Sequence, residues 1–343
     1  MGVNLKDLFE RKEITLDELS GKILAIDAYN MLYQFLTTIR TPEGQLLTDS
    51  KGNITSHLIG LFSRTCAFLE KGIKPVFVFD GKPPELKIQE LHRRADIKRE
   101  AAKKYQEAEQ TGDINAMKKF GARTARLEKP MVEDAKKLVQ LLGLPAVQAP
   151  SEGEAQCAHM AQTNAVWAVA SQDYDSLLHG TPKLVQNLSI TGRRKIRGAI
   201  GTVLVSPALI KLQENLTQLA VSQDQLILLA LLVGTDYNYG GIHGIGPKKA
   251  LKIVKEHKNI EAVESAVNWK EHYEKPLTEL YELIKNIPVT DEYDISFQPI
   301  DAQKLTTFLV DEHDFGAERV KKTIDALGSK VREKSQKGLG AFL

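Results

Sequence analysis

The sequence predicts an α/β fold in which helices flank a mostly parallel central sheet. Three short apolar runs, at residues 22–27, 74–80 and 166–170, contain almost no polar residues, as expected for strands that are buried on both faces of a sheet. Between the first two runs lie two longer apolar stretches, at 31–36 and 58–69, which predict helices. This order of strand, helix, helix and strand is typical of a doubly wound α/β layer.

Each of the three apolar runs leads into aspartate residues. The first run ends at Asp27, the second at Asp80, and the third is followed by Asp173 and Asp175. Ligand sites in open α/β sheets lie in the crevice outside the carboxyl ends of the strands, so these acids are candidates for one site. A single aspartate at a strand end can equally form a turn or cap a helix. We expect Asp173 and Asp175 to share a site only if the chain turns after Gln172.

Composition and charge place the chain in a broad class without identifying a partner. Its 343 residues include 46 Lys and Arg and 44 Asp and Glu, a formal net charge of +2. The two cysteines, Cys66 and Cys157, stand among apolar neighbours and are expected to be free thiols in a reducing compartment. The longest apolar run, 226–233, is much shorter than the ~20 residues of a membrane span. Without a signal peptide, we expect an intracellular protein, located in the cytoplasm or nucleoid.

The segment from 85 to about 140 has a different character, because it is highly charged and contains no strand signal. Residues 82–137 hold 15 Lys and Arg against 10 Asp and Glu, so the basic charge of the chain is concentrated here. Glycines at 112 and 121 divide the segment into exposed helices that leave the sheet and return to it. Taken alone, such a composition is more often that of an ordinary solvated helix surface. Its dense basic residues could also contact several phosphates.

The residues that follow contain two further acids. Ser151 and Glu154 fit the S-x-x-E capping box, which gives Glu154 a structural explanation but leaves Glu152 without one. A strand is predicted at 183–186, followed by a basic turn at 192–195.

A glycine-rich turn follows the apolar helix predicted at 226–233. Gly234 should end that helix, and Asp236 comes directly after it. The turn at 240–246 leads into a helix that begins at Pro247 and carries Lys248 and Lys249. Backbone N–H groups at such a helix start can bind an anion, although a purely structural turn between helices is the alternative.

Seven carboxylates therefore stand at strand ends or beside helix ends. Gathering them at one sheet edge is repulsive unless cations neutralise them, and Mg²⁺ binds carboxylate oxygens while keeping water molecules and substrate phosphates as further ligands. Two Mg²⁺ ions about 4 Å apart can hold the attacking water and the leaving oxygen of a phosphoryl displacement. The predicted metal ligands are Asp27, Asp80, Glu152, Glu154, Asp173, Asp175 and Asp236.

Five ordered motifs make the sequence resemble a known family over nearly its whole length. They are Asp27-Ala-Tyr-Asn with Tyr33-Gln-Phe, Phe79-Asp80-Gly-Lys-Pro-Pro84, Pro150-Ser-Glu-Gly-Glu-Ala-Gln156, Ser171-Gln-Asp-Tyr-Asp175, and Gly234-Thr-Asp-Tyr with Gly244-Ile-Gly-Pro-Lys248. They resemble motifs of the XPG and flap endonuclease family of 5′-nucleases, with the archaeal flap endonucleases most similar. The resemblance implies a PIN-like nuclease fold with a helical arch and a helix-hairpin-helix element.

The resemblance also implies an activity and a role for individual residues. It predicts an Mg²⁺-dependent 5′ flap endonuclease and 5′–3′ exonuclease that acts in Okazaki fragment maturation and base excision repair, with Mn²⁺ able to substitute. Lys87 and Arg94 match the basic residues that act on the scissile phosphate. The predicted DNA contacts are Gly2, Tyr33, Arg40, Gly244, Gly246, Lys248 and Lys249, with K⁺ as a further ion at the hairpin.

The end of the chain resembles a sliding-clamp-binding motif of the form Q-x-x-aliphatic-x-x-aromatic-aromatic. Its matching residues are Gln336, Leu339, Phe342 and Leu343. Leu343 departs from the second aromatic position, which lowers the expected affinity. The predicted plan is a single monomeric nuclease domain at 1–327 and a flexible tail at 328–343. Within the domain we expect an N-terminal part at 1–81, the arch at about 82–137, an internal part at about 138–240, and the hairpin with C-terminal helices at about 241–327.

Two alternatives remain at this point. A related nuclease that acts on gaps, bubbles or Holliday junctions would carry the same motifs. A non-catalytic scaffold that binds branched DNA on the clamp would not need a repulsive cluster of seven acids, which argues against that reading.

Overall fold

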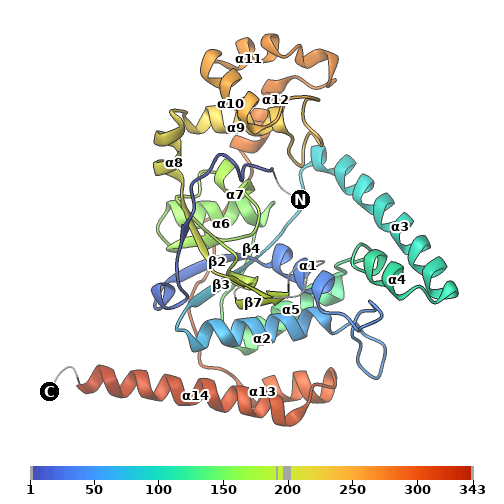
Figure 1. Ribbon diagram of the computed structural model, residues 1–343. Helices are drawn as coiled ribbons and strands as arrows, with labels where there is room; N and C mark the ends of the chain where they lie inside the picture. The colour runs from blue at the N-terminus through green and yellow to red at the C-terminus, as the bar shows by residue number, and fades with distance from the viewer. Residues whose placement is uncertain (1–2, 191, 196–201, 341–343) are drawn as a thin grey trace.

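The computed structural model describes residues 3–190, 192–195 and 202–340, and a seven-stranded sheet lies at its centre (Figure 1). The strand order is β1-β9-β6-β5-β2-β3-β4. All neighbouring pairs from β6 to β4 are parallel, whereas β9 runs antiparallel to both β6 and β1. The predicted mostly parallel sheet is therefore confirmed. The strands are β1 (Lys12–Glu13), β2 (Ile23–Asp27), β3 (Lys74–Phe79), β4 (Ala146–Gln148), β5 (Ala168–Ala170), β6 (Lys183–Gln186) and β9 (Ala208–Lys211).

The two faces of the sheet belong to two hydrophobic cores, since alternate strand residues point to opposite sides. In β2, Leu24 and Ile26 face one core and Ala25 faces the other. The core on the side of Leu24 is covered by α1 (Ala28–Thr38), α2 (Ser56–Glu70), α5 (Lys129–Leu141), α13 (Ala302–Thr306) and α14 (Ala317–Gly340). The opposite core contains α6 (Gly153–Gln162), α7 (Asp175–Leu178), α8 (Leu212–Leu219), α9 (Gln223–Val233), α10 (Pro247–Glu256), α11 (Ile260–Ala266) and α12 (Leu277–Lys285).

Two helices, α3 (Ile88–Thr111) and α4 (Ile114–Gly121), project from the side of the molecule (Figure 1). The left-handed conformation of Gly112, with φ of 69°, ends α3, and the side chain of Asp113 then caps α4. We call this pair the arch. The chain returns through α5, whose Ala135 and Leu138 are fully buried in the core. The predicted arch boundary at 137 thus falls inside a core helix, and the projecting part ends before Lys129.

Local structure departs from the sequence expectations at two places. Residues 192–195 form strand β7 (Gly192–Lys195), which pairs antiparallel with β8 (Thr202–Val205) in a separate two-stranded sheet, so the predicted basic turn is wrong. The predicted tail boundary at 328 lies inside α14, which continues without interruption to Gly340. Within the described residues no single helix is long and apolar enough to cross a membrane; α8 and α9 meet that test only as a bent pair, by length and composition.

Candidate active site

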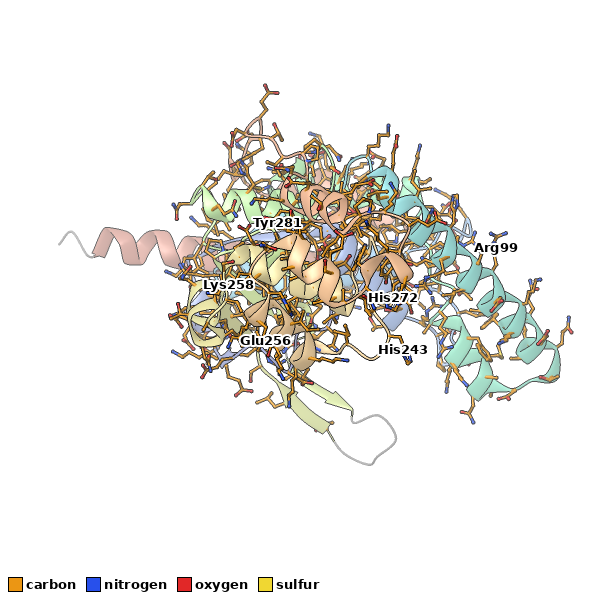
Figure 2. All side chains as sticks on the ribbon, turned by 90° about the horizontal axis from the view of Figure 1, so that it is seen from above. Arg99, His243, Glu256, Lys258, His272 and Tyr281 are labelled. Carbon is orange, nitrogen blue, oxygen red and sulfur yellow. The ribbon has the colours of Figure 1, made fainter. Side chains whose placement is uncertain are left out.

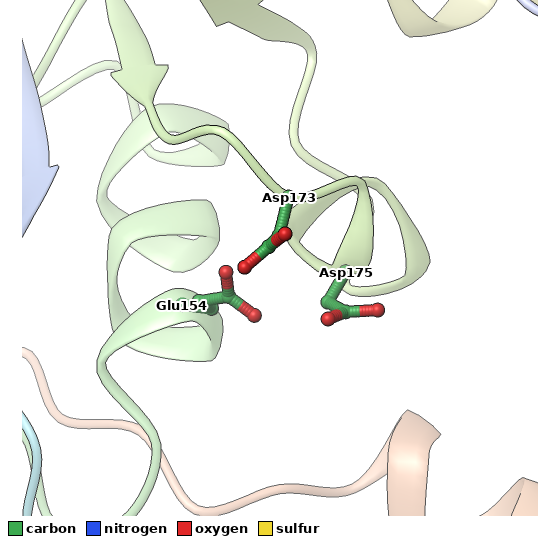
Figure 3. Close-up of side chains that lie close together, drawn as sticks. All are labelled: Glu154, Asp173 and Asp175. Carbon is green, nitrogen blue, oxygen red and sulfur yellow. The ribbon is translucent and has the colours of Figure 1, made fainter. Parts of the chain in front are cut away.

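The carboxyl ends of the parallel strands bring the predicted acids together. Asp173 follows β5, Asp175 begins α7, and Glu154 lies in the first turn of α6. Each of these three carboxylates offers an oxygen within 4.8 Å of the other two (Figure 3). The chain turns at Tyr174, which has helical backbone angles, so Asp173 and Asp175 do share one site.

Asp27 and Asp80 stand at the ends of the neighbouring strands β2 and β3. Burial, followed by repulsion from Asp80 and Asp173, raises the pKa of Asp27 to about 8. Burial also raises the pKa of Asp80 to about 6, with a smaller contribution from Glu152. These mutual effects show that the strand-end acids lie within electrostatic reach of the three in Figure 3.

The remaining pKa shifts have the same origin. Burial and the neighbouring Asp173 and Asp236 raise the pKa of Asp175 to about 7. The pKa of Glu154 is raised well above its usual value by burial and by Asp175, Asp27 and Asp173. We refer to the seven acids as the acid cluster.

Backbone N–H groups orient two members of this cluster. The N–H of Gly153 donates to Asp80 Oδ1 over 2.7 Å, and the N–H of Val3 donates to Asp175 Oδ1 over 2.9 Å. A Cβ at position 153 would lie 2.7 Å from Asp80 Oδ1, so a side chain there would force this carboxylate to shift. The capping box expected for Ser151 and Glu154 is absent from this described helix start: Glu152 is the N-cap without a side-chain bond, and the Ser151 hydroxyl donates to the Lys82 carbonyl instead. That alternative explanation of Glu154 is therefore wrong.

Two cations from the base of the arch enter the acid cluster. Lys87 forms an ion pair with Glu152 and lies 3.3 Å from an Asp236 oxygen. Arg94 pairs with the other Asp236 oxygen. Burial opposes the charge on Lys87, but Glu152 and Asp236 raise its pKa, so it stays protonated. The structure thus places both predicted basic residues beside the predicted metal ligands.

The donor set fits hard divalent cations. All seven predicted ligands offer carboxylate oxygens, which are the ligands that Mg²⁺ prefers. Within the described residues, the positive side chains paired directly with the cluster are those of Lys87 and Arg94, and they reach only Glu152 and Asp236. Asp27 is buried, Glu154 and Asp175 are partly buried, and all three are crowded with raised pKa values, as expected for a site completed by metal ions.

The predicted DNA contacts fall on three different parts of the surface. Tyr33 on α1 is half-buried, and Lys98 Nζ lies 4.6 Å from its ring centroid. Arg40 has a structural role, because its guanidinium donates to the carbonyls of Leu36 and Gly44, each over 2.8 Å.

The glycine turn before α10 has the predicted form. Gly246 is the N-cap and Pro247 begins the helix, while Gly244 has a φ of 79°. Lys248 and Lys249 are exposed in the first turn. Figure 2 looks onto the C-terminal helices and shows His243 in this turn and Arg99 on α3, with the arch extending beside them.

Several predicted residues lie beyond what the structure describes. Gly2, Phe342 and Leu343 are outside the described residues, and for Gln336 and Leu339 only the helical backbone of α14 is described.

Three residues that donate hydrogen bonds to the acids were not predicted as site residues. The Asn30 side chain donates to Asp173 over 2.7 Å, and the Ser171 hydroxyl donates to Glu154 over 3.3 Å. Tyr237 donates its hydroxyl to Glu152. All three stand inside the motifs quoted above, next to the acids. Their positions could therefore have marked them as orienting groups.

Comparisons with known proteins agree with this geometry. Residues 1–101 match the XPG N-terminal domain and residues 143–236 match the XPG I-region. Flap endonuclease 1 of Pyrococcus abyssi is 50% identical over 342 residues, covering 100% of this chain and 98% of that protein. Flap endonuclease 1 of Aeropyrum pernix is 49% identical over 337 residues, covering 97% and 96%.

Solved structures extend the similarity to three dimensions. Flap endonuclease-1 from Methanococcus jannaschii superposes with a TM-score of 0.76 at 40% identity, covering 97% of this chain and 100% of that one. The catalytic core of Rad2 in complex with DNA substrate superposes with a TM-score of 0.69 at 23% identity, covering 92% and 96%, and shares the fold.

Proposed function

Because the chain belongs to the flap endonuclease family of XPG-type nucleases, we propose that it is a structure-specific 5′ flap endonuclease and 5′–3′ exonuclease. Its substrate is branched DNA that carries a 5′ flap, cut near the junction of single and double strands. The cellular roles that go with this activity are Okazaki fragment maturation and base excision repair, in the cytoplasm or nucleoid of an archaeal cell.

The observation that carries the proposal is the meeting of the acid cluster with Lys87 and Arg94. Carboxylates alone would fit many metal sites. Lys87 and Arg94 reach the acid cluster from the base of the arch and add donors for a phosphate group. This combination suits phosphodiester hydrolysis.

The acid cluster would hold two Mg²⁺ ions, with Mn²⁺ as a substitute. When bound, such ions activate water and stabilise the leaving oxygen of a phosphodiester. The chain's own residues orient the metal ligands. The N–H of Gly153 fixes the orientation of Asp80, and the N–H of Val3 fixes that of Asp175. Lys87 and Arg94 donate to the scissile phosphate, where they stabilise the charge that develops during the reaction.

Substrate positioning is assigned to surfaces away from the acids. Tyr33 stacks on the base next to the cut. Arg40, just beyond the end of α1, also contacts the DNA. Gly2 would contact the DNA through its freed amino group. Gly244, Gly246, Lys248 and Lys249 bind the duplex backbone at the hairpin, with K⁺ as a further ion. The arch receives the single strand.

A cleavage panel tests the proposal. Labelled 5′ flap, gapped, bubble and four-way DNA substrates are incubated with the protein in Mg²⁺, and again with chelator. We expect Mg²⁺-dependent cutting that is fastest on the 5′ flap. Preference for bubbles or four-way junctions would move the protein to a related nuclease class, and binding without cutting would identify a scaffold.

The roles of Lys87 and Arg94 need a separate measurement. Replacing both by alanine should slow single-turnover cleavage much more than it weakens DNA binding, because their contacts strengthen in the transition state. Equal losses in rate and binding would reduce them to ordinary phosphate contacts. Lys321→Ala with Lys322→Ala, at exposed sites of α14 outside the arch, is a control with the same loss of charge.

The C-terminal motif supports a proposal about a partner. Gln336, Leu339, Phe342 and Leu343 would bind a sliding clamp of the PCNA type, while the nuclease itself acts as a monomer. Removing residues 336–343 should leave cleavage of free flap DNA unchanged and abolish stimulation by the clamp. Unchanged stimulation would reject the motif, and light scattering of the isolated protein tests the monomeric state.

A further inference from the structure

A buried carboxylate in the first turn of α3 has no place in the mechanism above. Glu90 is 6% exposed, although the other acids of α3 are exposed. Buried carboxylates persist where cations and hydrogen bonds satisfy them. The partners of Glu90 therefore show what it does.

Glu90 binds two consecutive arginines. Arg93 makes a two-pronged contact, with Nε 2.6 Å from Oε2 and Nη2 2.8 Å from Oε1. Arg94 Nε donates to Oε1 over 2.8 Å. Exposed pairs at this helical spacing contribute only a few tenths of a kcal/mol. Here the carboxylate is buried and shared, so it fixes both guanidinium groups at once.

Both arginines continue from Glu90 to the same loop on the other side of the site. The Arg94 Nη2 group pairs with Asp236, and the Arg93 guanidinium lies 3.4 Å from the ring centroid of Tyr239. Asp236 and Tyr239 both belong to the loop between α9 and α10. The base of the arch is thus joined to the loop that leads into the hairpin at two points, and Glu90 organises both.

We propose that Glu90 is a positioning residue that aims Arg94 into the acid cluster and holds Arg93 against Tyr239, so that the arch base and the hairpin loop act as one unit. This inference rests on the proposed function for its catalytic consequence. Without Glu90, Arg93 and Arg94 would lose the carboxylate that they share, and Arg94 would keep only its bond to Asp236. The Nε and Nη2 groups of Arg94 are held by different carboxylates, which leaves its plane little freedom.

The first test separates positioning from general structure. Glu90→Gln should slow single-turnover cleavage of a 5′ flap in Mg²⁺ by about 10-fold to 100-fold, while binding of the same DNA with chelator changes less than about 3-fold. In an Arg94→Ala background, Glu90→Gln should produce no further loss, because the group it positions is gone. An unchanged rate in the single variant, or an equal additional loss in the Arg94→Ala background, would overturn the proposal. Glu100→Gln, at an exposed site of the same helix, is the matched control.

The second test does not depend on cleavage. Trypsin digestion in the absence of DNA and metal should cut the arch faster in Glu90→Gln, and to a smaller extent in Tyr239→Leu, than in wild type or Glu100→Gln, because the ties to the loop are weakened. Equal digestion of all four proteins would contradict the proposed link. If wild type fails to cut flap DNA but the digestion pattern is as expected, the proposed function is wrong. The link that Glu90 forms between the arch base and the hairpin loop is then still supported.

Discussion

Asp27 and Asp49 are shielded almost equally from solvent, at 6% and 7% exposed, yet the pKa values of their carboxyls move in opposite directions. Burial and the acids around it raise the pKa of Asp27 to about 8. Burial also disfavours the charge of Asp49, but hydrogen bonds from Asn53 and Lys51 outweigh it and lower the pKa of that carboxyl. Burial thus dominates at Asp27, where the surrounding acids add to it, whereas hydrogen bonds overcome burial at Asp49.

The two aspartates belong to regions with different tasks. Asp49 accepts three bonds of 2.8 to 2.9 Å within the loop between α1 and α2, and His313 Nδ1 lies 3.8 Å away at an ion-pair distance. We call Asp49, His57 and His313 the Asp49 cluster; it joins this loop and α2 to the segment before α14. Within it, the Asp49 carboxylate is satisfied by the protein itself. The carboxylates of the acid cluster repel one another, and external cations are needed to neutralise them.

The largest expected effect is a loss of cleavage activity when the acid cluster, rather than the Asp49 cluster, is changed. Asp175→Asn should reduce Mg²⁺-dependent flap cleavage by about 1,000-fold or more, since loss of a metal ligand removes several kcal/mol of transition-state stabilisation. Flap DNA binding, measured by fluorescence anisotropy in chelator, should change little. Full activity in this variant would remove Asp175 from the metal site.

The Asp49 cluster should respond to pH through His57. This side chain is fully buried, and burial, with repulsion from His313, lowers its pKa from 6.5 to about 4. The unfolded state therefore binds more protons between these values, and folding stability falls as the pH drops from 6.5 to 4, by about 3 kcal/mol in total.

Chemical unfolding at pH 7, 6 and 5 measures this contribution as the difference between wild type and His57→Leu, whose stability should depend less on pH. The acid cluster acts in the opposite sense, because its raised pKa values make the folded state bind protons more readily. Only the difference between the two proteins isolates His57. Parallel pH profiles would show that the buried imidazole is not neutral as we expect.

Metal ions should stabilise only the acid cluster. At 100 times the dissociation constant, Mg²⁺ should raise the unfolding free energy of wild type by about 2.7 kcal/mol, as for any ligand that binds only the folded state. The gain should be smaller in Asp175→Asn and undiminished in Asp49→Ala. Thermal scans with and without Mg²⁺ measure it, and a full gain in Asp175→Asn would place the ions elsewhere.

The smallest expected effect is a loss of stability without a loss of chemistry. Asp49→Ala leaves the N–H groups of Lys51 and Asn53 without their acceptor and should lower the unfolding free energy by about 1 to 3 kcal/mol. Cleavage of flap DNA at a temperature where the variant is folded should match wild type. A selective loss of cleavage would connect the Asp49 cluster to the active site.

The strand-end acids could be predicted because a carboxylate after an apolar run is a local signal. The arrangement of β2, β3 and β5 then follows from general rules for parallel sheets. Glu154 shows the limit of local reasoning: its spacing from Ser151 fits a capping box, but the Ser151 hydroxyl finds a partner in Lys82, 69 positions earlier in the chain.

Other features depended on pairings that no local pattern contains. Residues 192–195 look like a turn until β8 is available as their partner. The charged segment after 82 predicts helices but not where they rejoin the core, which the burial of Ala135 and Leu138 decides. Glu90 was visible as a residue three and four positions before two arginines, yet only the fold brings Asp236 and Tyr239 to their other side.

The bond between Gly153 and Asp80 also links the orientation of one acid to the start of the helix that carries another. A Cβ at position 153 would lie 2.7 Å from Asp80 Oδ1, so the Asp80 carboxylate would have to turn aside to make room for it. A chain of the same fold with another residue between the two glutamates could therefore keep all seven carboxylates and still hold Asp80 in a different orientation. The presence of the acids in a sequence does not by itself establish that they are assembled.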